Sequence, residues 1–367
     1  MHKKRILCAV GTRPEAIKMA PVILALKNQP WADVRVLATA QHRQMLDKVL
    51  NFFSIAPDID LDIMRPNQPL TTLTARLLLA MDEVLLAEKP DVVLVQGDTT
   101  TVMAVALACF YHRIPIGHVE AGLRTWDMEN PFPEEANRVI AGKLAHWHFA
   151  PTEGSRQNLL REGVPDAGIS VTGNTVIDAL LMTAAKEFEI GIEIDACKRL
   201  VLVTAHRREN FGEPFRHICK ALRTLAERNV DVQFLYPVHP NPNVKDVAYE
   251  LLGTTGNIIL CEPLDYAPFV AAMKMAYLII SDSGGVQEEA PALGKPVLVL
   301  REETERPEAV EMGVVKLVGA NCDRIVEEVQ RLLDDSAAYQ AMARGGSPYG
   351  DGHAAERIVA VLKKHFV

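Results

Sequence analysis

Short apolar segments alternate with amphipathic segments along the first half of the chain, and this alternation constrains the fold more than any other feature. The apolar segments predict buried strands at residues 5–10, 34–39, 91–96, 115–120 and 147–150. The intervening segments have helical spacing and predict helices at residues 14–27, 43–53, 70–86, 99–111 and 133–144. Strands separated by helices imply right-handed crossovers and a parallel sheet.

A second series of the same kind follows, after a stretch at 173–193 where the pattern loosens and a linker is expected. It predicts strands at 199–204, 231–236, 257–260, 277–281, 296–300 and 314–318. It also predicts helices at 213–228 and 323–333, a Pro/Asn-rich loop at 239–243 and a final amphipathic helix at 353–365. A chain of 367 residues is too long for one ordinary core, so the sequence predicts an α/β protein of two doubly wound units.

Composition excludes several classes of partner. The net charge is −8 without a long basic run, so we expect no nucleic acid. We also expect no membrane span, because no segment has the apolar length required. The six cysteines are scattered without paired spacing, which is typical of reduced thiols in a cytoplasmic protein.

The segment after the 277–281 strand carries a glycine motif. Asp282-Ser283-Gly284-Gly285 leads directly into a helical segment that contains Glu289. Glycines at a helix N-terminus let a phosphate approach backbone N–H groups, and the helix dipole favours the negative charge. The same residues are also compatible with a plain strand–turn–helix corner in which Ser283 is the N-cap.

Polar clusters follow four of the predicted strands, where ligands bind in parallel sheets. They begin at Gly11, Gly97, Glu120 and Ala205. Each has a structural alternative: Asp98 as a helix cap, Glu134 with Arg138 as a surface ion pair, His206 and His239 as loop residues, and Arg306 as a counter-charge to acidic neighbours. Taken together they favour a site, because surface charge has no reason to gather at strand ends. No ligand spacing predicts a metal, and the Gly-x-Gly-x-x-Gly fingerprint of nicotinamide enzymes is missing.

These motifs as a set resemble the non-hydrolysing UDP-N-acetylglucosamine 2-epimerases of bacteria, over essentially the whole chain. The likeness is carried by Gly11-Thr-Arg-Pro-Glu-Ala-Ile-Lys18, Gln96-Gly-Asp-Thr-Thr-Thr101, His118-Val-Glu-Ala-Gly-Leu-Arg124, Pro133-Glu-Glu-Ala-Asn-Arg138, Thr172-Gly-Asn-Thr-Val-Ile-Asp178, His206-Arg-Arg-Glu209 and Asp282-Ser-Gly-Gly-Val-Gln-Glu-Glu289.

The resemblance implies a GT-B architecture, in which two Rossmann-like domains face each other across a cleft. The domains would be residues 1–174 and 175–352, with the last helix, 353–367, crossing back to the first. It also implies a homodimer that interconverts UDP-GlcNAc and UDP-ManNAc without cofactor or metal, supplying ManNAc units for surface polysaccharides. The reaction would be an anti-elimination of UDP to 2-acetamidoglucal, followed by re-addition.

The resemblance also implies roles for individual residues. The catalytic residues would be Asp98, Glu120, Glu134 and His206. The substrate and UDP contacts would be Arg13, Lys18, Arg138, Leu264, Phe269, Ser283, Gly284, Gly285, Glu289 and Arg306. Position 264 is Leu where some relatives carry Gln, so a contact there would use the backbone. An activating second UDP-GlcNAc would lie beside Gln41, Gln44 and His239, although the 64–68 loop does not clearly match that pattern.

Three other functions are compatible with parts of the pattern. A GT-B glycosyltransferase would share the diphosphate site but usually needs one main base rather than three carboxylates. A hydrolysing UDP-GlcNAc 2-epimerase, the nearest chemical alternative, would release free ManNAc and UDP. A catalytically silent nucleotide-sugar sensor would keep the glycine motif without any need for Asp98, Glu120 and Glu134.

Overall fold

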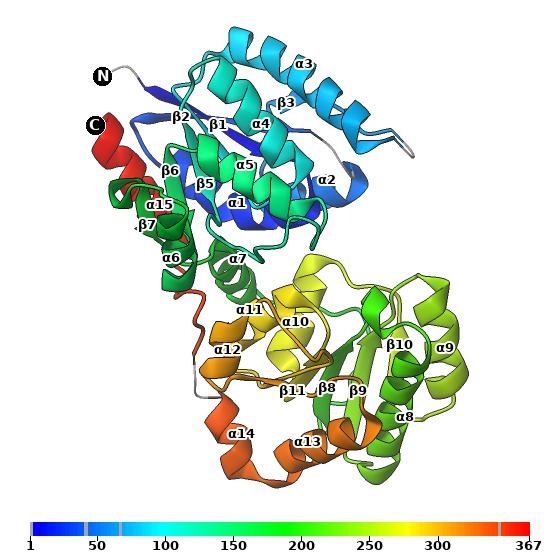
Figure 1. Cartoon of the computed structure of the whole chain (residues 1–367). Coiled ribbons are helices and arrows are strands. Elements are labelled where there is room, and N and C mark those ends of the chain that lie inside the picture. The colour runs from blue at the N-terminus through cyan, green and yellow to red at the C-terminus, as the bar shows by residue number, and fades with distance from the viewer. Residues whose placement is uncertain (1–2, 40–42, 66–67, 344–345) are drawn as a thin grey trace. The chain divides into compact units, whose positions relative to one another are not determined.

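The computed structural model describes residues 3–39, 43–65, 68–343 and 346–367, and of residues 43–45 it describes the backbone alone. The chain forms two compact units (Figure 1). The first comprises Met1–Ala179 and Tyr349–Val367, and the second comprises Leu180–Pro348. Each is a doubly wound, Rossmann-like α/β unit, as the sequence predicted.

The first unit is built on a seven-stranded parallel sheet in the order β3-β2-β1-β4-β5-β6-β7. Its strands are β1 (Lys4–Val10), β2 (Ala32–Ala38), β3 (Ile59–Asp60), β4 (Val92–Gln96), β5 (Ile116–Val119), β6 (Trp147–Ala150) and β7 (Ile169–Val171). Its helices are α1 (Arg13–Lys27), α2 (Arg43–Phe52), α3 (Leu70–Glu88), α4 (Thr100–Tyr111), α5 (Glu134–Leu144), α6 (Glu153–Arg161), α7 (Thr175–Ala184, which runs into the second unit) and α15 (Ala354–Phe366). All five residues of β4 are buried, which explains its continuous apolar run.

Two layers of helices cover this sheet. Helices α3, α4 and α5 pack against one another in one layer, and α1 packs against α2 and α15 in the other. The last helix is fixed to the first unit by Asp178 on α7, whose carboxylate accepts hydrogen bonds from the backbone N–H groups of Ala354 (3.2 Å) and Ala355 (2.8 Å). These bonds satisfy donors at the start of α15 that have no partner within the helix.

The second unit has a six-stranded parallel sheet in the order β10-β9-β8-β11-β12-β13. Its strands are β8 (Arg199–Thr204), β9 (Val232–Pro237), β10 (Ile258–Cys261), β11 (Leu278–Ser281), β12 (Val297–Val299) and β13 (Val315–Leu317). Its helices are α8 (Glu213–Arg228), α9 (Pro242–Leu252), α10 (Tyr266–Met275), α11 (Gly284–Ala292), α12 (Pro307–Glu311), α13 (Cys322–Asp334) and α14 (Ser336–Ala343).

Parts of the prediction were wrong. The expected linker at 173–193 contains α7, whose Val176, Ile177 and Leu180 are buried. The Pro/Asn-rich loop at 239–243 runs into α9, because the Asn241 side chain caps that helix by accepting from the backbone N–H of Asn243. Strands β3 and β7 and helices α6, α10, α12 and α14 were not predicted.

Candidate functional site

The order of the strands gathers the polar clusters of each unit at one point. In the first unit β1 and β4 are neighbours from which the chain winds in opposite directions, and Arg13 and Asp98 follow those two strands. In the second unit the corresponding neighbours are β8 and β11, which are followed by His206 and Ser283. Ligands of doubly wound sheets bind beyond the carboxyl ends of the strands at this switch point.

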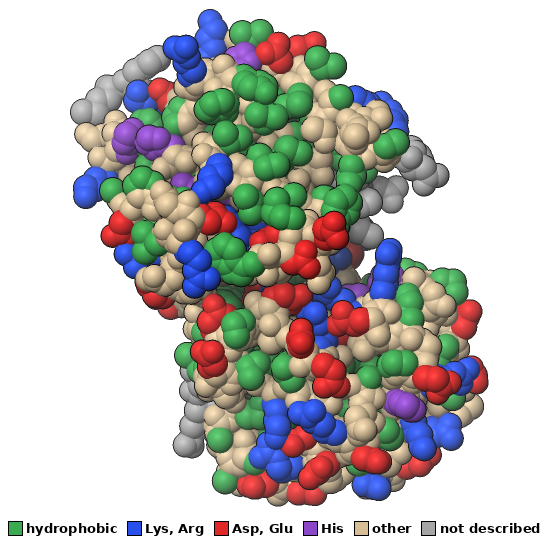
Figure 2. All heavy atoms as spheres, viewed as in Figure 1, with side chains coloured by type: hydrophobic (Ala, Val, Ile, Leu, Met, Phe, Trp, Pro, Cys, Tyr) green, Lys and Arg blue, Asp and Glu red, His purple; other side chains and the backbone are tan. Residues whose placement is uncertain are grey.

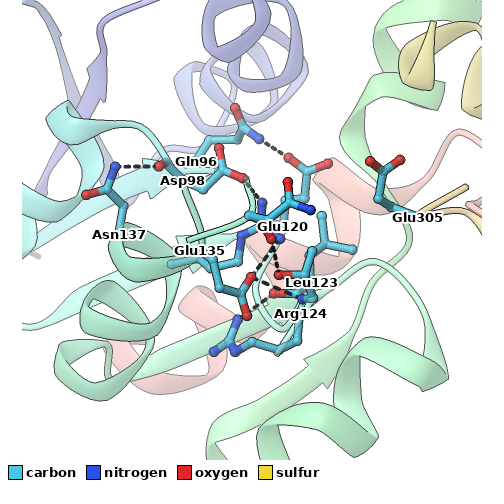
Figure 3. A network of polar contacts seen from close by, with 12 residues as sticks. Gln96, Asp98, Glu120, Leu123, Arg124, Glu135, Asn137 and Glu305 are labelled. Carbon is cyan, nitrogen blue, oxygen red and sulfur yellow. Dashed lines mark hydrogen bonds and ion pairs between the residues drawn. The ribbon is translucent and has the colours of Figure 1, made fainter. Parts of the chain in front are cut away.

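Glu120 follows β5 and is held by three side chains (Figure 3). Its Oε1 lies 2.5 Å from Nζ of Lys18 and 3.0 Å from Nδ2 of Asn174, and its Oε2 accepts a hydrogen bond from Gln96. Its φ of 63° is unusual for a residue other than glycine, and the residue is buried. The structure therefore brings Lys18 and Glu120 together.

Asp98 follows β4, which is next to β5 in the sheet, and it pairs with α5. Its Oδ2 lies 2.5 Å from Nη2 of Arg138, and its backbone carbonyl accepts from Nδ2 of Asn137 at 2.9 Å (Figure 3). The N-cap of α4 is Thr99, whose hydroxyl accepts from the N–H of Val102. Asp98 therefore does not cap α4, which was the alternative to a role in a site.

Glu134 and Arg138 do not form the surface ion pair that their spacing allows, as far as the described residues extend. Arg138 pairs instead with Glu135, whose Oε2 lies 3.2 Å from Nη1, and with Asp98. Glu134 is half-buried in the first turn of α5, and no described contact joins it to the other two carboxylates. Arg13 is likewise half-buried, at the first position of α1.

Two buried glutamates next to these residues were missed from the sequence. Glu15 accepts from the N–H groups of Gly11 (2.5 Å) and Thr12 (2.7 Å) and from the Thr99 hydroxyl (2.5 Å), so it joins the loops that follow β1 and β4. Burial raises its pKa to about 7, against the opposing effect of these hydrogen bonds. The signal was a capping box, a threonine followed three residues later by glutamate.

Glu135 is the second of the two missed glutamates. It accepts from the N–H groups of Thr125 (3.1 Å) and Trp126 (3.0 Å), and so fixes the loop before α5 (Figure 3). In the sequence, Glu135 is only one of two adjacent glutamates at a helix start. Helical geometry turns Glu135 into the interior, whereas Glu134 is only half-buried.

In the second unit, α11 begins at the two glycines. Ser283 occupies the N-cap position, but its side chain makes no capping hydrogen bond, so the simple capping interpretation fails. A Cβ atom on Gly284 would lie 3.0 Å from the Arg306 guanidinium, which places that cation beside the helix N-terminus. Arg306 is held there by Glu288, whose Oε1 lies 2.8 Å from Nε.

Glu289 lies one turn into α11 and folds back toward the glycines. Its Oε2 would be 3.6 Å from a Cβ atom on Gly285, and its Oε1 accepts from the Tyr266 hydroxyl at 3.3 Å. Leu264 lies in the loop before α10 and Phe269 lies within that helix, both half-buried.

His206 lies in the loop after β8, beside the buried Asp282. The backbone N–H groups of His206 and Arg207 donate to Oδ2 of Asp282 at 2.7 and 2.8 Å. The ring of His206 stacks on that of the exposed His239, with centroids 5.5 Å apart. Of the other residues expected at an activator site, Gln41 lies outside the described residues, and only the backbone of Gln44 is described, in α2.

Among the described residues, no group of three or more His, Cys, Asp and Glu side chains could hold a metal ion. No helix in the described ranges is long and apolar enough to cross a bilayer. All six cysteines are free thiols.

Comparison with known proteins identifies the family. The model of the UDP-N-acetylglucosamine 2-epimerase family matches residues 24–363. The UDP-N-acetylglucosamine 2-epimerase of Escherichia coli K12 is 56% identical over 98% of this chain and 99% of its own. That of Salmonella typhimurium LT2 is 55% identical over 99% of both chains. The crystal structure of the UDP-GlcNAc 2-epimerase from Neisseria meningitidis bound to UDP-GlcNAc is 48% identical and matches with a TM-score of 0.90, covering 98% of this chain and 100% of that one.

These likenesses confirm the predicted GT-B-like fold class and define the chain as an enzyme, an isomerase that acts on nucleotide sugars. The chain belongs to the UDP-N-acetylglucosamine 2-epimerase family.

Proposed function

We propose that the chain interconverts UDP-GlcNAc and UDP-ManNAc by inverting C2 of the sugar. The observation that carries this proposal is the pair of carboxylates, Asp98 and Glu120, at the ends of adjacent strands, each oriented by a cation. Inversion at a weakly acidic carbon needs proton transfer on two faces, and therefore at least two positioned acid/base groups.

The proposed reaction is an anti-elimination followed by re-addition. A carboxylate takes the proton from C2, the electrons of that bond form the C1=C2 double bond, and the C1–O bond breaks with its electrons on UDP. The enzyme then holds UDP and 2-acetamidoglucal. Re-addition of UDP to C1, with a proton delivered to the opposite face of C2, gives the epimer. Asp98, Glu120 and Glu134 are the proposed acid/base residues, and ion pairs with Arg138 and Lys18 orient the first two.

In this proposal, UDP is held by the start of α11. Its diphosphate would lie beside Ser283 and accept from the backbone N–H groups of Gly284 and Gly285, where the helix dipole favours negative charge. Arg306 lies at that helix terminus, which suits it to add a positive charge. The remaining proposed contacts are Glu289 to the ribose, Leu264 and Phe269 to uracil, and Arg13, Lys18, Arg138 and His206 to the sugar and the departing diphosphate.

A direct experiment tests this function. Pure protein is incubated with UDP-GlcNAc alone, and the anomeric proton signals are followed by NMR. We expect the signals of UDP-ManNAc to grow to a constant ratio with those of UDP-GlcNAc. Free ManNAc and UDP would instead indicate the hydrolysing reaction, and an unchanged spectrum would reject the proposal.

We also propose a homodimer formed by the face of α3, α4 and α5. Large apolar side chains are exposed there: Leu79 at 72%, Tyr111 at 69%, Leu86 at 58% and Phe110 at 57% (Figure 2). An apolar face of this kind is typical of a subunit interface. Tyr111→Glu should give a monomer in light scattering, whereas Val230→Glu, at a residue that is 76% exposed in the second unit, should leave the dimer intact.

The remaining proposals concern the cellular setting. The free cysteines support a cytoplasmic location, where thiols stay reduced. The product would supply ManNAc units for surface polysaccharides. Activation by a second UDP-GlcNAc near Gln41, Gln44 and His239 also remains a proposal.

A further inference from the structure

Asp282 joins the two sides of the switch point in the second unit. Its side chain is fully buried, and Oδ2 accepts from three donors in the loop after β8: the N–H of His206 at 2.7 Å, the N–H of Arg207 at 2.8 Å and Nδ2 of Asn210 at 3.2 Å. Its own N–H donates to the carbonyl of Thr204, the last residue of β8, at 3.0 Å. Because Asp282 directly precedes Ser283, its carboxylate fixes the loop that carries His206 to the start of the glycine motif.

The second oxygen of this carboxylate is directed at the imidazole of His206. Oδ1 of Asp282 has no hydrogen-bond partner among the described residues, and it lies 3.4 Å from Nδ1 of His206. A buried carboxylate oxygen without a donor costs free energy. A proton on Nδ1 of His206 would give Oδ1 of Asp282 that donor. Closing this gap by a few tenths of an ångström completes a normal hydrogen bond.

The other charged groups near His206 act against a proton on the ring. Burial has the largest effect on the pKa of His206 and lowers it. The negative charge of Asp282 raises this pKa, and the nearby His239 and Arg207 lower it further. His239 stacks on His206 at an interplanar angle of 13°, and its own Nδ1 accepts from the N–H of Asn241 at 3.2 Å. His206 is therefore a neutral ring whose tautomer is open to control by its neighbours.

We propose that Asp282 is a positioning residue that holds neutral His206 in the Nδ1–H tautomer. In this tautomer Nε2 carries the lone pair and is free to take a proton from solvent when negative charge is bound beside it. The resulting imidazolium directs Nδ1–H to Asp282 and Nε2–H to the anion. The inference deepens the proposed function, because it rests on His206 stabilising the departing diphosphate.

The substitution that tests this is Asp282→Asn, which keeps the size of the side chain. The amide oxygen can still accept from the N–H groups of His206 and Arg207. The NH₂ group then replaces Oδ1 and donates to Nδ1, so the neutral ring must carry its proton on Nε2. The variant therefore switches the tautomer without removing the contacts that hold the loop.

The tautomer is read directly by two-bond ¹H–¹⁵N correlation on full-length protein with ¹⁵N-labelled histidine, at a pH above the histidine titrations and without UDP. His206→Asn identifies the His206 signals among the eleven histidines. We expect the Nδ1–H pattern in the wild type and the Nε2–H pattern in Asp282→Asn. A wild-type His206 in the Nε2–H form would overturn the proposal, and this measurement does not depend on how the variant folds.

Titration of the same signals gives a second test, in which two substitutions should shift the pKa of His206 in opposite directions. Asp282→Asn should lower the pKa of His206, because it removes the negative charge, and His239→Gln should raise it without changing the tautomer. Shifts in the same direction would contradict the assigned roles. Turnover of UDP-GlcNAc by Asp282→Asn should fall by roughly a hundredfold in kcat, with KM changed less.

These readouts separate the two proposals. If the wild-type tautomer is as expected but the protein does not epimerise UDP-GlcNAc, the proposed function fails and the role of Asp282 stands. If the protein epimerises UDP-GlcNAc but wild-type His206 is in the Nε2–H form, the proposed function stands and the role of Asp282 fails.

Discussion

Replacing Gly285 with valine perturbs the proposed diphosphate site while leaving the structure around it intact. A Cβ atom at this position would meet only the Glu289 carboxylate, at 3.6 Å, and the Ser283 hydroxyl, at 3.9 Å, both ordinary contacts. The backbone of Gly285 is helical, so valine introduces no strain. The added methyl groups would stand where a phosphate must approach the N–H groups of the first helical turn.

The magnitude follows from the bonds that would be lost. A hydrogen bond to a charged group contributes about 1.5–3 kcal/mol, so losing one or two costs about 3 kcal/mol. That free energy corresponds to roughly a hundredfold rise in the Kd of UDP. The free energy of unfolding should change by less than about 0.5 kcal/mol, because an added Cβ atom meets nothing closer than 3.6 Å.

Isothermal titration calorimetry with UDP measures the affinity, and thermal unfolding checks the fold. Gly256→Val is the matched control, because this glycine lies in a turn of the same unit and nothing is within 4 Å of its Cβ position. The control should bind UDP like the wild type. If folded Gly285→Val also binds UDP like the wild type, the α11 assignment is wrong.

Two further predictions concern carboxylates of the first unit. Asp98→Asn should lower kcat by about a hundredfold to ten-thousandfold, the usual contribution of an acid/base group, while the Kd of UDP stays the same; a near-normal rate in an NMR assay would remove Asp98 from catalysis. Glu15 should make the protein less stable as pH rises, because its pKa is about 7 in the folded chain against an ordinary value of 4.5. Its contribution is full below pH 4.5, and about 3 kcal/mol should be lost as pH passes through 7. Glu15→Gln keeps an acceptor for Gly11 and Thr12 and lacks the titration, so urea unfolding of both proteins at pH 5 and pH 8 isolates the effect. Equal pH dependence in the two proteins would show that Glu15 does not titrate as its burial implies.

The sequence predicted the long elements and the positions of polar residues at strand ends, because period and composition are local properties. Helix α8 and strand β6 were predicted with the observed bounds. Strand order is not a local property, so the sequence did not show that the loops carrying Arg13 and Asp98 are neighbours, as are those carrying His206 and Ser283.

The buried carboxylates that connect these loops were the main omission. Glu15 and Asp282 each bridge the two central loops of one unit, and their partners lie 84 and about 76 residues away along the chain. Such pairings leave little trace in a single sequence. The expected linker at α7 failed for a related reason, because Asp178 binds the start of a helix 176 residues further on.

Epimerisation by elimination and re-addition requires proton transfer at C2, and the reaction in D₂O follows that transfer directly. Wild-type protein is incubated with UDP-GlcNAc in D₂O, and C2 of the UDP-ManNAc product is examined by NMR and mass spectrometry. We expect one deuterium at C2, because the proton taken from one face exchanges before another is delivered to the other face. A product that keeps its original proton at C2 would rule out this exchange and would indicate hydride transfer or internal return of the proton.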